Sequence, residues 1–386
     1  MLDPRRLAVA LVGFCAFLQL YTPQSLLPLF TAEFGAGHAA VSLTVSAATL
    51  AVAIVAPFAG ALADRIGRRK MIIAAIFILV LPTALIATAR TLDEILVWRF
   101  LQGLLLPPIF AVAVAYIGEE WPPIEVSSVL GVYTAGSALG GFMGRLISGF
   151  AADHIGWRGA YLVLAGIELV AALVVVRYLP PERRFVPMSG LANALRTMGR
   201  HLTNPRILVT FGIGFAILFT FVALFTYVSF HLADPPYSLS SAGLGLIFVV
   251  YLFGVIVTPW TGRLMLRMGR RKLAVLAIAV WCVSVALTLA QSLPLILAGL
   301  ALAAACGFVC QTLSQGFLAT IATAGRSSAI GLYVTIYYIG GSAGALLPAP
   351  AYAAFGWPGC VVLVIGVLAV MAVAVMTVWG SDRPRA

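Results

Sequence analysis

The sequence has few charged residues: only 10% of its 386 residues are Asp, Glu, Lys or Arg, whereas soluble domains carry about 25%. Hydrophobic residues make up 62% of the chain, and the mean hydropathy is +1.06. This composition excludes a soluble enzyme, because a folded chain this apolar cannot cover its surface with polar groups. It also excludes a disordered chain, which needs more charge and fewer apolar residues. We therefore expect the lipid bilayer to be the solvent of this protein.

Residue types that carry chemistry are also scarce. The five cysteines fall inside apolar runs without a C-x-x-C pair, so we expect free thiols with packing roles. The four histidines lie near predicted helix ends, and neither H-E-x-x-H nor the ATP-binding sequence G-x-x-x-x-G-K-[ST] occurs. We therefore expect a protein that is not an enzyme, holds no metal or other cofactor, and draws its energy from an ion gradient rather than from ATP.

Long apolar runs occur instead, bounded by charged residues or by proline and glycine. Each is close to the roughly 20 residues that cross hydrocarbon as a helix rising 1.5 Å per residue. The sequence therefore predicts an all-α membrane protein with twelve transmembrane helices, over residues 7–30, 39–63, 71–89, 93–118, 127–150, 158–179, 207–232, 239–263, 273–292, 293–318, 327–350 and 357–379. The first run is too long for a signal peptide and has no clear cleavage site, so we keep it as a helix.

The longest connection, residues 180–206, separates six of these helices from the other six. It contains LANALRTMGRHL, whose apolar spacing predicts a short helix lying on the inner membrane surface. We therefore predict an N-terminal six-helix bundle over 1–179, a cytoplasmic linker over 180–206 and a C-terminal six-helix bundle over 207–386. No loop is long enough to hold a soluble catalytic domain.

Basic residues gather on one side of the predicted membrane. With the N-terminus inside, the two tails and the inner loops hold 20 of the 24 Lys and Arg, and the outer loops hold only Arg90 and Arg158. Because cytoplasmic loops are enriched in Lys and Arg, we expect a multi-pass protein of the cell (inner) membrane with both termini in the cytoplasm. This placement accounts for the net charge of +11 without a nucleic-acid partner.

The two halves of the chain repeat one another. An offset of 202 residues aligns PFAGALADRIGRRK at 57–70 with PWTGRLMLRMGRRK at 259–272, and an offset of 200 aligns GVYTAGSALGGFMG at 131–144 with GLYVTIYYIGGSAG at 331–344. Within the first half, G-x-x-x-D-x-x-G-x-R occurs twice, with its acids at Asp64 and Asp153. Nested repeats of this kind are typical of transporters in which two similar halves rock around a central site.

These residues resemble the major facilitator superfamily, and the likeness covers the whole chain. GALADRIGRR matches the family's loop 2–3 signature G-x-x-x-D-R-x-G-R-R at every named position. The resemblance implies that this loop sets the balance between inward-facing and outward-facing states, a role that it assigns to Gly60, Asp64, Arg65, Gly67 and Arg68. An aspartate there can meet the positive N-terminus of a neighbouring helix in only one of the two states. Since the second copy has Leu266 in place of Asp64, we expect an asymmetric switch.

Two further segments resemble motifs of the twelve-helix drug:proton antiporter branch. RFLQG at 99–103 resembles the fourth-helix R-x-x-Q-G motif, which the resemblance associates with proton coupling. The fifth helix resembles the antiporter signature G-x8-G-x3-G-P-x-x-G-G, with Arg145 where Pro is usual. Matching glycines in the fifth and eleventh helices predict close helix packing that permits bending, although any single glycine can serve ordinary packing. The glycines of this predicted seam are Gly131, Gly140, Gly144, Gly149, Gly340 and Gly344.

Three charged side chains, Arg99, Arg145 and Glu168, lie inside predicted helices, where charge is costly and therefore points to function. Counted from the predicted outer ends, they lie about 9, 8 and 15 Å deep. Two arginines at one depth repel unless an anion lies between them, which could be Glu168 or a substrate carboxylate. Glu168 is then the candidate proton carrier, since the second half offers only Asp234 and Asp382, both outside helices. The alternative is a static Arg145–Glu168 pair with Arg99 reaching the outer surface.

Polar side chains on four helices are candidates for the substrate lining, because the resemblance implies that the first, fourth, seventh and tenth helices line a central cavity. These side chains are Gln19, Tyr21, Gln24, Gln102, Tyr227, Gln311 and Gln315. We therefore predict a secondary active transporter working by alternating access, in the first place a proton-coupled exporter of small amphipathic or anionic compounds. An importer, an exchanger or a uniporter of the same fold is the alternative. The expected partners of a monomeric chain are a small-molecule substrate, protons and the bilayer.

Overall fold

The computed structural model describes residues 3–182, 198–322 and 326–379. Within those ranges every regular element is a helix, which confirms the predicted all-α class. The surface helix predicted within residues 180–206 falls mostly outside the described residues.

Nine helices in these ranges are long and apolar enough to cross a membrane. One of them, α6 (Pro123–Tyr178), runs through two predicted spans and turns at Gly156, whose φ is 77°. The first predicted span is interrupted into α1 (Pro4–Leu20), η1 (Thr22–Ser25) and α2 (Leu27–Phe34), and α12 (Arg270–Leu287) begins with three basic residues. Counting α6 as two spans, and adding the interrupted first span and α12, brings the nine to the twelve predicted spans.

The chain divides into two compact units. Unit 1 consists of Met1–Ala192 and Ser238–Phe248, and unit 2 of Asn193–Tyr237 and Val249–Ala386. Residues 238–248 lie within the predicted C-terminal bundle, 207–386, but their contacts group them with unit 1. The predicted boundaries of the two six-helix bundles therefore stay a prediction.

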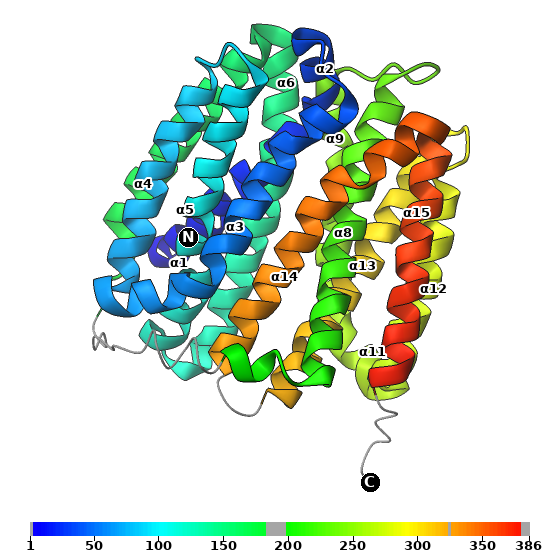
Figure 1. Ribbon diagram of the computed structural model, residues 1–386. Coiled ribbons are helices and arrows are strands. Elements are labelled where there is room, and N and C mark those ends of the chain that lie inside the picture. The colour runs from blue at the N-terminus through cyan, green and yellow to red at the C-terminus, as the bar shows by residue number, and fades with distance from the viewer. Residues whose placement is uncertain (1–2, 183–197, 323–325, 380–386) are drawn as a thin grey trace. The chain divides into compact units, whose positions relative to one another are not determined.

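Unit 1 is built from α1, α2 and α6 together with α3 (His38–Ile66), α4 (Arg68–Ile86), α5 (Leu92–Glu120) and the short α9 (Ser241–Ile247). Helix α1 packs along α6, α3 packs along α5, and α4 lies against both α5 and α6 (Figure 1). The interruption of the first span lies against α3, α6 and α9.

Unit 2 contains α8 (Pro205–Ala233), α10 (Tyr251–Val257), α11 (Thr261–Met268), α12, α13 (Leu293–Ile321), α14 (Arg326–Leu346) and α15 (Pro348–Val378). Helices α14 and α15 pack on α8, and α12 packs on α13. Helix α15 turns at Gly356, which has a φ of 61° and is the repeat counterpart of Gly156.

Glycines permit the same close helix approach in both units. In unit 1, a Cβ atom at Gly140 would lie 2.3 Å from the Phe14 carbonyl oxygen of α1, and one at Gly144 would lie 2.0 Å from that of Leu18. In unit 2, the α14–α8 contact repeats this geometry. A Cβ atom at Gly340 would lie 2.2 Å from the Phe215 carbonyl oxygen, and one at Gly344 would lie 2.4 Å from that of Phe219. No other residue fits at these separations, so the sequence repeat is also a repeat of backbone contacts.

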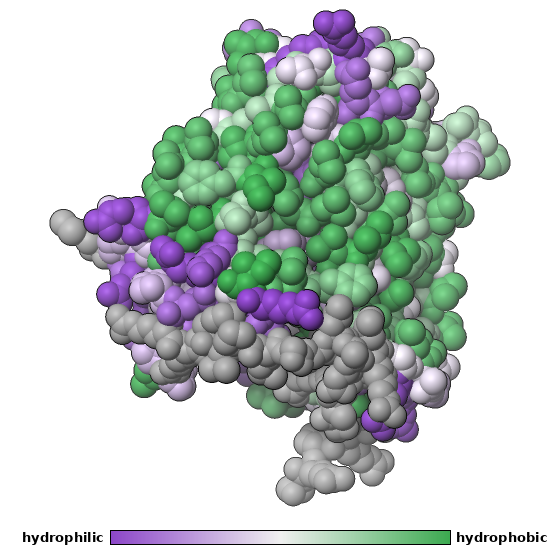
Figure 2. Space-filling view, turned by 60° about the vertical axis from the view of Figure 1, so that its left-hand side comes forward, coloured by the Kyte–Doolittle hydropathy of each residue, from purple (hydrophilic) through white to green (hydrophobic). Residues whose placement is uncertain are grey.

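The outward surface of both units is apolar. Leu81 and Val170 in unit 1 are 60% and 63% exposed, and Val362 and Val370 in unit 2 are 70% and 71% exposed. Figure 2 shows apolar side chains over most of one face, with hydrophilic residues gathered toward its upper and lower ends. Such a surface is stable in hydrocarbon and costly in water.

Candidate functional site

The first membrane span is broken inside unit 1, and two prolines account for the break. Helix α1 ends at Leu20, and η1 and α2 follow with Pro23 and Pro28 in their first turns. A proline has no backbone N–H, so Pro23 leaves the carbonyl of Gln19, four residues earlier, without its helical partner. The N–H of Gln24 turns to the Tyr21 carbonyl at 3.1 Å, which releases the carbonyl of Leu20 as well.

Arg99 of α5 occupies this break. Its guanidinium donates to the released carbonyls of Gln19 at 2.7 Å and Leu20 at 2.6 Å, and Nε donates to the Thr44 carbonyl of α3 at 3.0 Å. The side chain is 0% exposed. The arginine therefore replaces the hydrogen bonds that Pro23 removes, and its charge is held by carbonyl dipoles at the negative C-terminal end of α1.

A chain of hydrogen bonds leads from Arg99 to Glu168 of α6. Arg99 donates to Gln102 Oε1 at 2.6 Å, and Gln102 Nε2 donates to the Thr83 hydroxyl at 2.8 Å. That hydroxyl lies 3.3 Å from Glu168 Oε2, which also accepts a hydrogen bond from Gln19 Nε2 at 3.1 Å. Glu168 is 0% exposed, and its Oε1 has no hydrogen-bond partner among the described residues.

Arg145 of α6 lies on the other side of the break. Its Nε donates to Gln24 Oε1 at 2.8 Å, and its guanidinium donates to the Gly141 carbonyl at 2.6 Å. The guanidinium carbon lies 4.9 Å from the ring centre of Tyr21 and 4.4 Å from that of Phe248. The side chain is only 3% exposed, so two aromatic rings and neutral oxygens surround its charge.

The three intramembrane charges thus have neutral partners. The side-chain hydrogen-bond partners of Glu168 are Gln19 and Thr83, so the static Arg145–Glu168 pair is not formed in this structure. The burial of Arg99 also rules out the alternative in which it reaches the surface. Sequence reasoning missed Thr83 and the helix break itself, although the closely spaced Pro23 and Pro28 were a signal for the break.

The signature loop places several carboxylates around one arginine. Arg68 donates to Asp64 Oδ1 at 2.8 Å and to Glu119, while its backbone N–H donates to Glu182 Oε1 at 2.5 Å. Gly67 has a φ of 100°, a backbone conformation that favours glycine, and a Cβ there would lie 2.8 Å from Glu182 Oε2, so the Glu182 side chain would have to shift for any other residue. Arg65 is exposed, and nothing lies within 4 Å of a Cβ at Gly60.

The sequence predicts that Asp64 meets a helix N-terminus. In the structure, the other first-half occurrence of G-x-x-x-D-x-x-G-x-R, which carries Asp153, makes such a contact. Asp153 Oδ1 and Oδ2 accept the backbone N–H groups of Ser241 at 3.1 Å and Ala242 at 2.9 Å, in the first turn of α9. Gly149 permits the approach, because a Cβ there would lie 2.1 Å from the Ser241 carbonyl oxygen. A carboxylate in this position is favoured by the free N–H groups and by the helix dipole.

The arginines of the two motif copies cap helix C-termini in equivalent ways. Arg69 donates to the carbonyls of Val176 at 3.0 Å and Leu179 at 2.9 Å, at the end of α6. Arg158 donates to the Ala89 carbonyl at 3.0 Å, just beyond the end of α4, and forms a salt bridge with Glu33 at 3.0 Å. Hydrogen bonding to Arg158 holds the pKa of Glu33 below its usual range. The nested repeat therefore has a physical role in joining the third and sixth spans.

Comparison with known proteins identifies the family. The sequence profile of the Major Facilitator Superfamily matches residues 9–257 and 233–386. The chain belongs to the major facilitator superfamily. It is therefore a membrane transporter and not an enzyme.

Relatives within the superfamily carry transporter names. An "uncharacterized transporter" of Buchnera aphidicola subsp. Schizaphis graminum (strain Sg) is 32% identical over 337 residues, 87% of this chain and 82% of the relative. The inner membrane transport protein YnfM of Escherichia coli (strain K12) is 34% identical over 267 residues, 68% of this chain and 64% of the relative. The multidrug resistance protein MdtG of Salmonella paratyphi B is 30% identical over 190 residues, 48% of this chain and 46% of the relative.

A solved structure agrees with the superfamily fold. The nucleoside transporter NupG aligns with a TM-score of 0.81 over 97% of this chain and 100% of that chain, at 13% identity. At this identity the likeness concerns the fold alone.

The remaining candidates for the substrate lining and the glycine seam lie outside the polar network around the first span. Tyr227 of α8 is fully buried, and its hydroxyl donates to the Ala345 carbonyl at 2.8 Å. On α13, Gln311 is half-buried and Gln315 is exposed, and nothing lies within 4 Å of a Cβ at Gly131 of α6. The dense polar network around the first span, in contrast, includes Gln19, Gln24 and Gln102.

We expect Asp64→Asn to shift the populations of the two transport states by up to about 5-fold, because exposed ion pairs contribute up to about 1 kcal/mol. The asparagine keeps the size of the side chain but removes the charge that faces Arg68. Single-molecule fluorescence transfer between a dye in each unit measures the populations. The control Lys70→Gln changes an exposed charge two residues after Arg68 and should leave them unchanged. Unaltered populations in Asp64→Asn, or an equal shift in the control, would contradict the switch assignment.

Proposed function

We propose that this chain is a proton-coupled exporter and that Glu168 carries the proton. The observation that supports the proposal is the burial of Glu168 with one carboxyl oxygen unpartnered and without a salt bridge among the described residues. An ionised carboxylate in this setting costs several kcal/mol. A bound proton removes that cost, which supports a proton on Glu168 in this arrangement.

The hydrogen bonds of Thr83 agree with a proton on Glu168. The Leu79 carbonyl at 2.8 Å and Glu168 Oε2 at 3.3 Å can both accept the single hydrogen of the Thr83 hydroxyl oxygen. The same oxygen accepts from Gln102 Nε2, which leaves its second acceptor position for the contact with Glu168 Oε2. A protonated Glu168 donates to that position and leaves the Thr83 hydrogen on the nearer Leu79 carbonyl, whereas an ionised Glu168 has to draw that hydrogen away from Leu79.

Loss of the proton would then change the first span. An ionised Glu168 needs a cation, and the nearest one along the hydrogen-bond chain is Arg99. If Arg99 turns to Glu168, it leaves the carbonyls of Gln19 and Leu20, and the break in the span loses its support. Proton release thereby favours a different arrangement of this span, which is the differential interaction that coupling requires.

The surroundings of Arg145 and the name of one relative support the proposed substrate class. Arg145 lies between two aromatic rings beside Gln24, a setting that suits an amphipathic or anionic compound with a flat apolar part. The related MdtG is named a multidrug resistance protein, which supports export. We further propose a monomer made of two six-helix bundles, with both termini in the cytoplasm, because the basic residues gather on that side.

Proton movement in proteoliposomes tests this function. The purified protein is reconstituted around a pH-sensitive dye, and a panel of organic anions and cations is added under an imposed pH gradient. We expect an active compound to release protons down the gradient, and empty liposomes to give no signal. Tracer exchange of a compound without proton movement would contradict the proposal and would indicate a uniporter or exchanger.

A further inference from the structure

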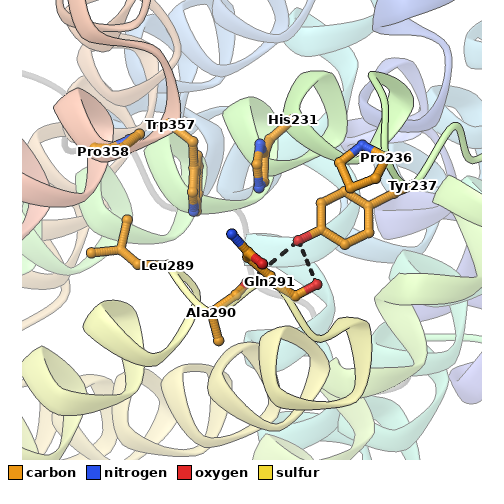
Figure 3. A pocket seen from close by; sticks show the side chains of 8 residues that line it. All are labelled: His231, Pro236, Tyr237, Leu289, Ala290, Gln291, Trp357 and Pro358. Atoms are coloured by element: carbon orange, nitrogen blue, oxygen red, sulfur yellow. Dashed lines mark hydrogen bonds between the residues drawn. The ribbon is translucent and has the colours of Figure 1, made fainter.

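A cavity of about 320 Å³ opens in unit 2, at the end where α8 finishes and α13 begins. Its walls come from the end of α8, the loop that follows, the turn between α12 and α13, and the second part of α15. Figure 3 shows the rings of His231, Tyr237 and Trp357 around it, with Gln291 between them. A volume of this size is within the range of small-molecule sites.

The polar tips of the cavity's aromatic side chains are held by the backbone. The Tyr237 hydroxyl donates to the Gln291 carbonyl at 3.0 Å, and Trp357 Nε1 donates to the Thr288 carbonyl at 3.1 Å. The imidazole of His231 is parallel to the Trp357 ring, with centres 5.5 Å apart, and meets the Tyr237 ring edge-on at 5.4 Å. The rings therefore present carbon surface and π electrons to the cavity.

Among the described residues at this end of unit 2, the one fixed charge is negative. Residues 231–237, 287–293 and 346–358, which form this end of unit 2, contain one acidic residue, Asp234, and no lysine or arginine. Asp234 is exposed, and its charge acts on both His231 and Tyr352. A cation is therefore favoured here over an anion.

The corresponding place in unit 1 contains a cation supplied by the chain. Trp157 follows Gly156 as Trp357 follows Gly356, and the guanidinium carbon of Arg158 lies 4.1 Å from the centre of the Trp157 ring. Arg158 also pairs with Glu33 at 3.0 Å. Arg158 thus makes a salt bridge with Glu33 and a cation–π contact with Trp157 at the same time.

Unit 2 keeps the acid and the tryptophan of this arrangement but lacks its cation. In the glycine seams, Phe215 and Phe219 of unit 2 hold the positions of Phe14 and Leu18 of unit 1, which is an offset of 201 residues. At this offset Asp234 corresponds to Glu33. At the offset of 200 that joins the two tryptophans, Arg158 corresponds to Pro358, which lines the cavity. The cavity thus lies where unit 1 has its arginine.

We propose that this cavity binds a small organic cation, a guanidinium or ammonium group carried on a flat apolar body. The cation takes the place that Arg158 holds in unit 1, near Asp234, and the apolar body lies against Tyr237 and Leu289. A guanidinium suits the site because it stacks on aromatic rings and pairs with a carboxylate. The site is separate from the network around Glu168 and does not depend on the proposed proton coupling.

Isothermal titration with benzylguanidine tests the proposal on the full-length protein in lipid nanodiscs. The measurement is made at pH 8, where an ordinary imidazole is neutral, so that a charged His231 does not compete with the added cation. Empty nanodiscs correct for partitioning into lipid. We expect saturable binding of benzylguanidine and at least about 10-fold weaker binding of phenylacetate, an anion with a similar ring.

Variants at two exposed positions make the test specific, because neither removes a buried side chain. Pro358→Arg recreates the arginine of unit 1 and should abolish benzylguanidine binding, whereas Pro358→Gln should retain it. Asp234→Asn should weaken binding about 5-fold, in the range of a single exposed charge pair. Glu168→Gln should bind as the wild type does, even if it loses transport. Absent binding, equal binding in Pro358→Arg and Pro358→Gln, or a preference for phenylacetate would overturn the proposal.

Discussion

Glu168→Gln is expected to abolish proton-driven transport while substrate still binds. Glutamine has the size of a protonated glutamic acid, so the contacts with Gln19 and Thr83 can persist and the fold is retained. It cannot lose a proton at accessible pH, which fixes the chain in the equivalent of its proton-loaded form. Dye-loaded proteoliposomes measure the proton flux, and equilibrium binding of the same compound measures affinity.

Glu33→Gln is the matched control for this variant. Glu33 is also a glutamate of unit 1, but it lies at the end of α2 in a salt bridge with Arg158. It should transport protons at the wild-type rate, with at most a small loss of stability. Normal coupling in Glu168→Gln would remove Glu168 from the mechanism, and equal loss in both variants would point to general damage to unit 1.

Gly144→Val is expected to prevent accumulation of folded protein. The Cβ of any residue there would lie 2.0 Å from the Leu18 carbonyl oxygen, and the obstacle is backbone that cannot move without separating α1 from α6. Overpacking typically costs 1–3 kcal/mol, and a backbone clash in a helix seam should cost at least roughly 3 kcal/mol. Size-exclusion chromatography in detergent and a thermal melt measure the outcome.

Two further glycines give this prediction its controls. Gly131 lies in the same helix with nothing within 4 Å of its Cβ position, so Gly131→Val should yield folded protein at nearly the wild-type level. Gly344 of α14 is the repeat counterpart of Gly144, and a Cβ there would lie 2.4 Å from the Phe219 carbonyl oxygen. Gly344→Val should therefore be as damaging as Gly144→Val. Well-folded Gly144→Val protein would show that the seam tolerates separation and would contradict the account.

Much of the fold could be predicted from the sequence, because membrane spans depend on local composition. The apolar runs gave the twelve helices. The repeats gave the seam glycines, of which Gly140, Gly144, Gly340 and Gly344 make equivalent contacts in the two units, whereas Gly131 and Gly149 do not. The interruption of the first span was not predicted. Membrane helices tolerate proline when neighbouring groups satisfy the freed carbonyls, and the group that does so here, Arg99, is distant in the sequence.

The candidate site was predictable in its residues but not in its connections. Arg99, Arg145 and Glu168 stand out because charge is rare in the spans, yet sequence reasoning expected them to pair with one another or with an anion. Their actual partners are carbonyls, amides, a hydroxyl and aromatic rings, which are too common in any sequence to be singled out.

Infrared difference spectroscopy on the purified protein tests the central claim, that Glu168 is protonated where it is buried, most directly. A protonated carboxyl group has a carbonyl stretch that an ionised carboxylate lacks, and isotope labelling of glutamate assigns it to this residue type. The account predicts a glutamic acid band at neutral pH that is present in the wild type and absent in Glu168→Gln. A wild-type spectrum without that band, or a band that persists in Glu168→Gln, would contradict it.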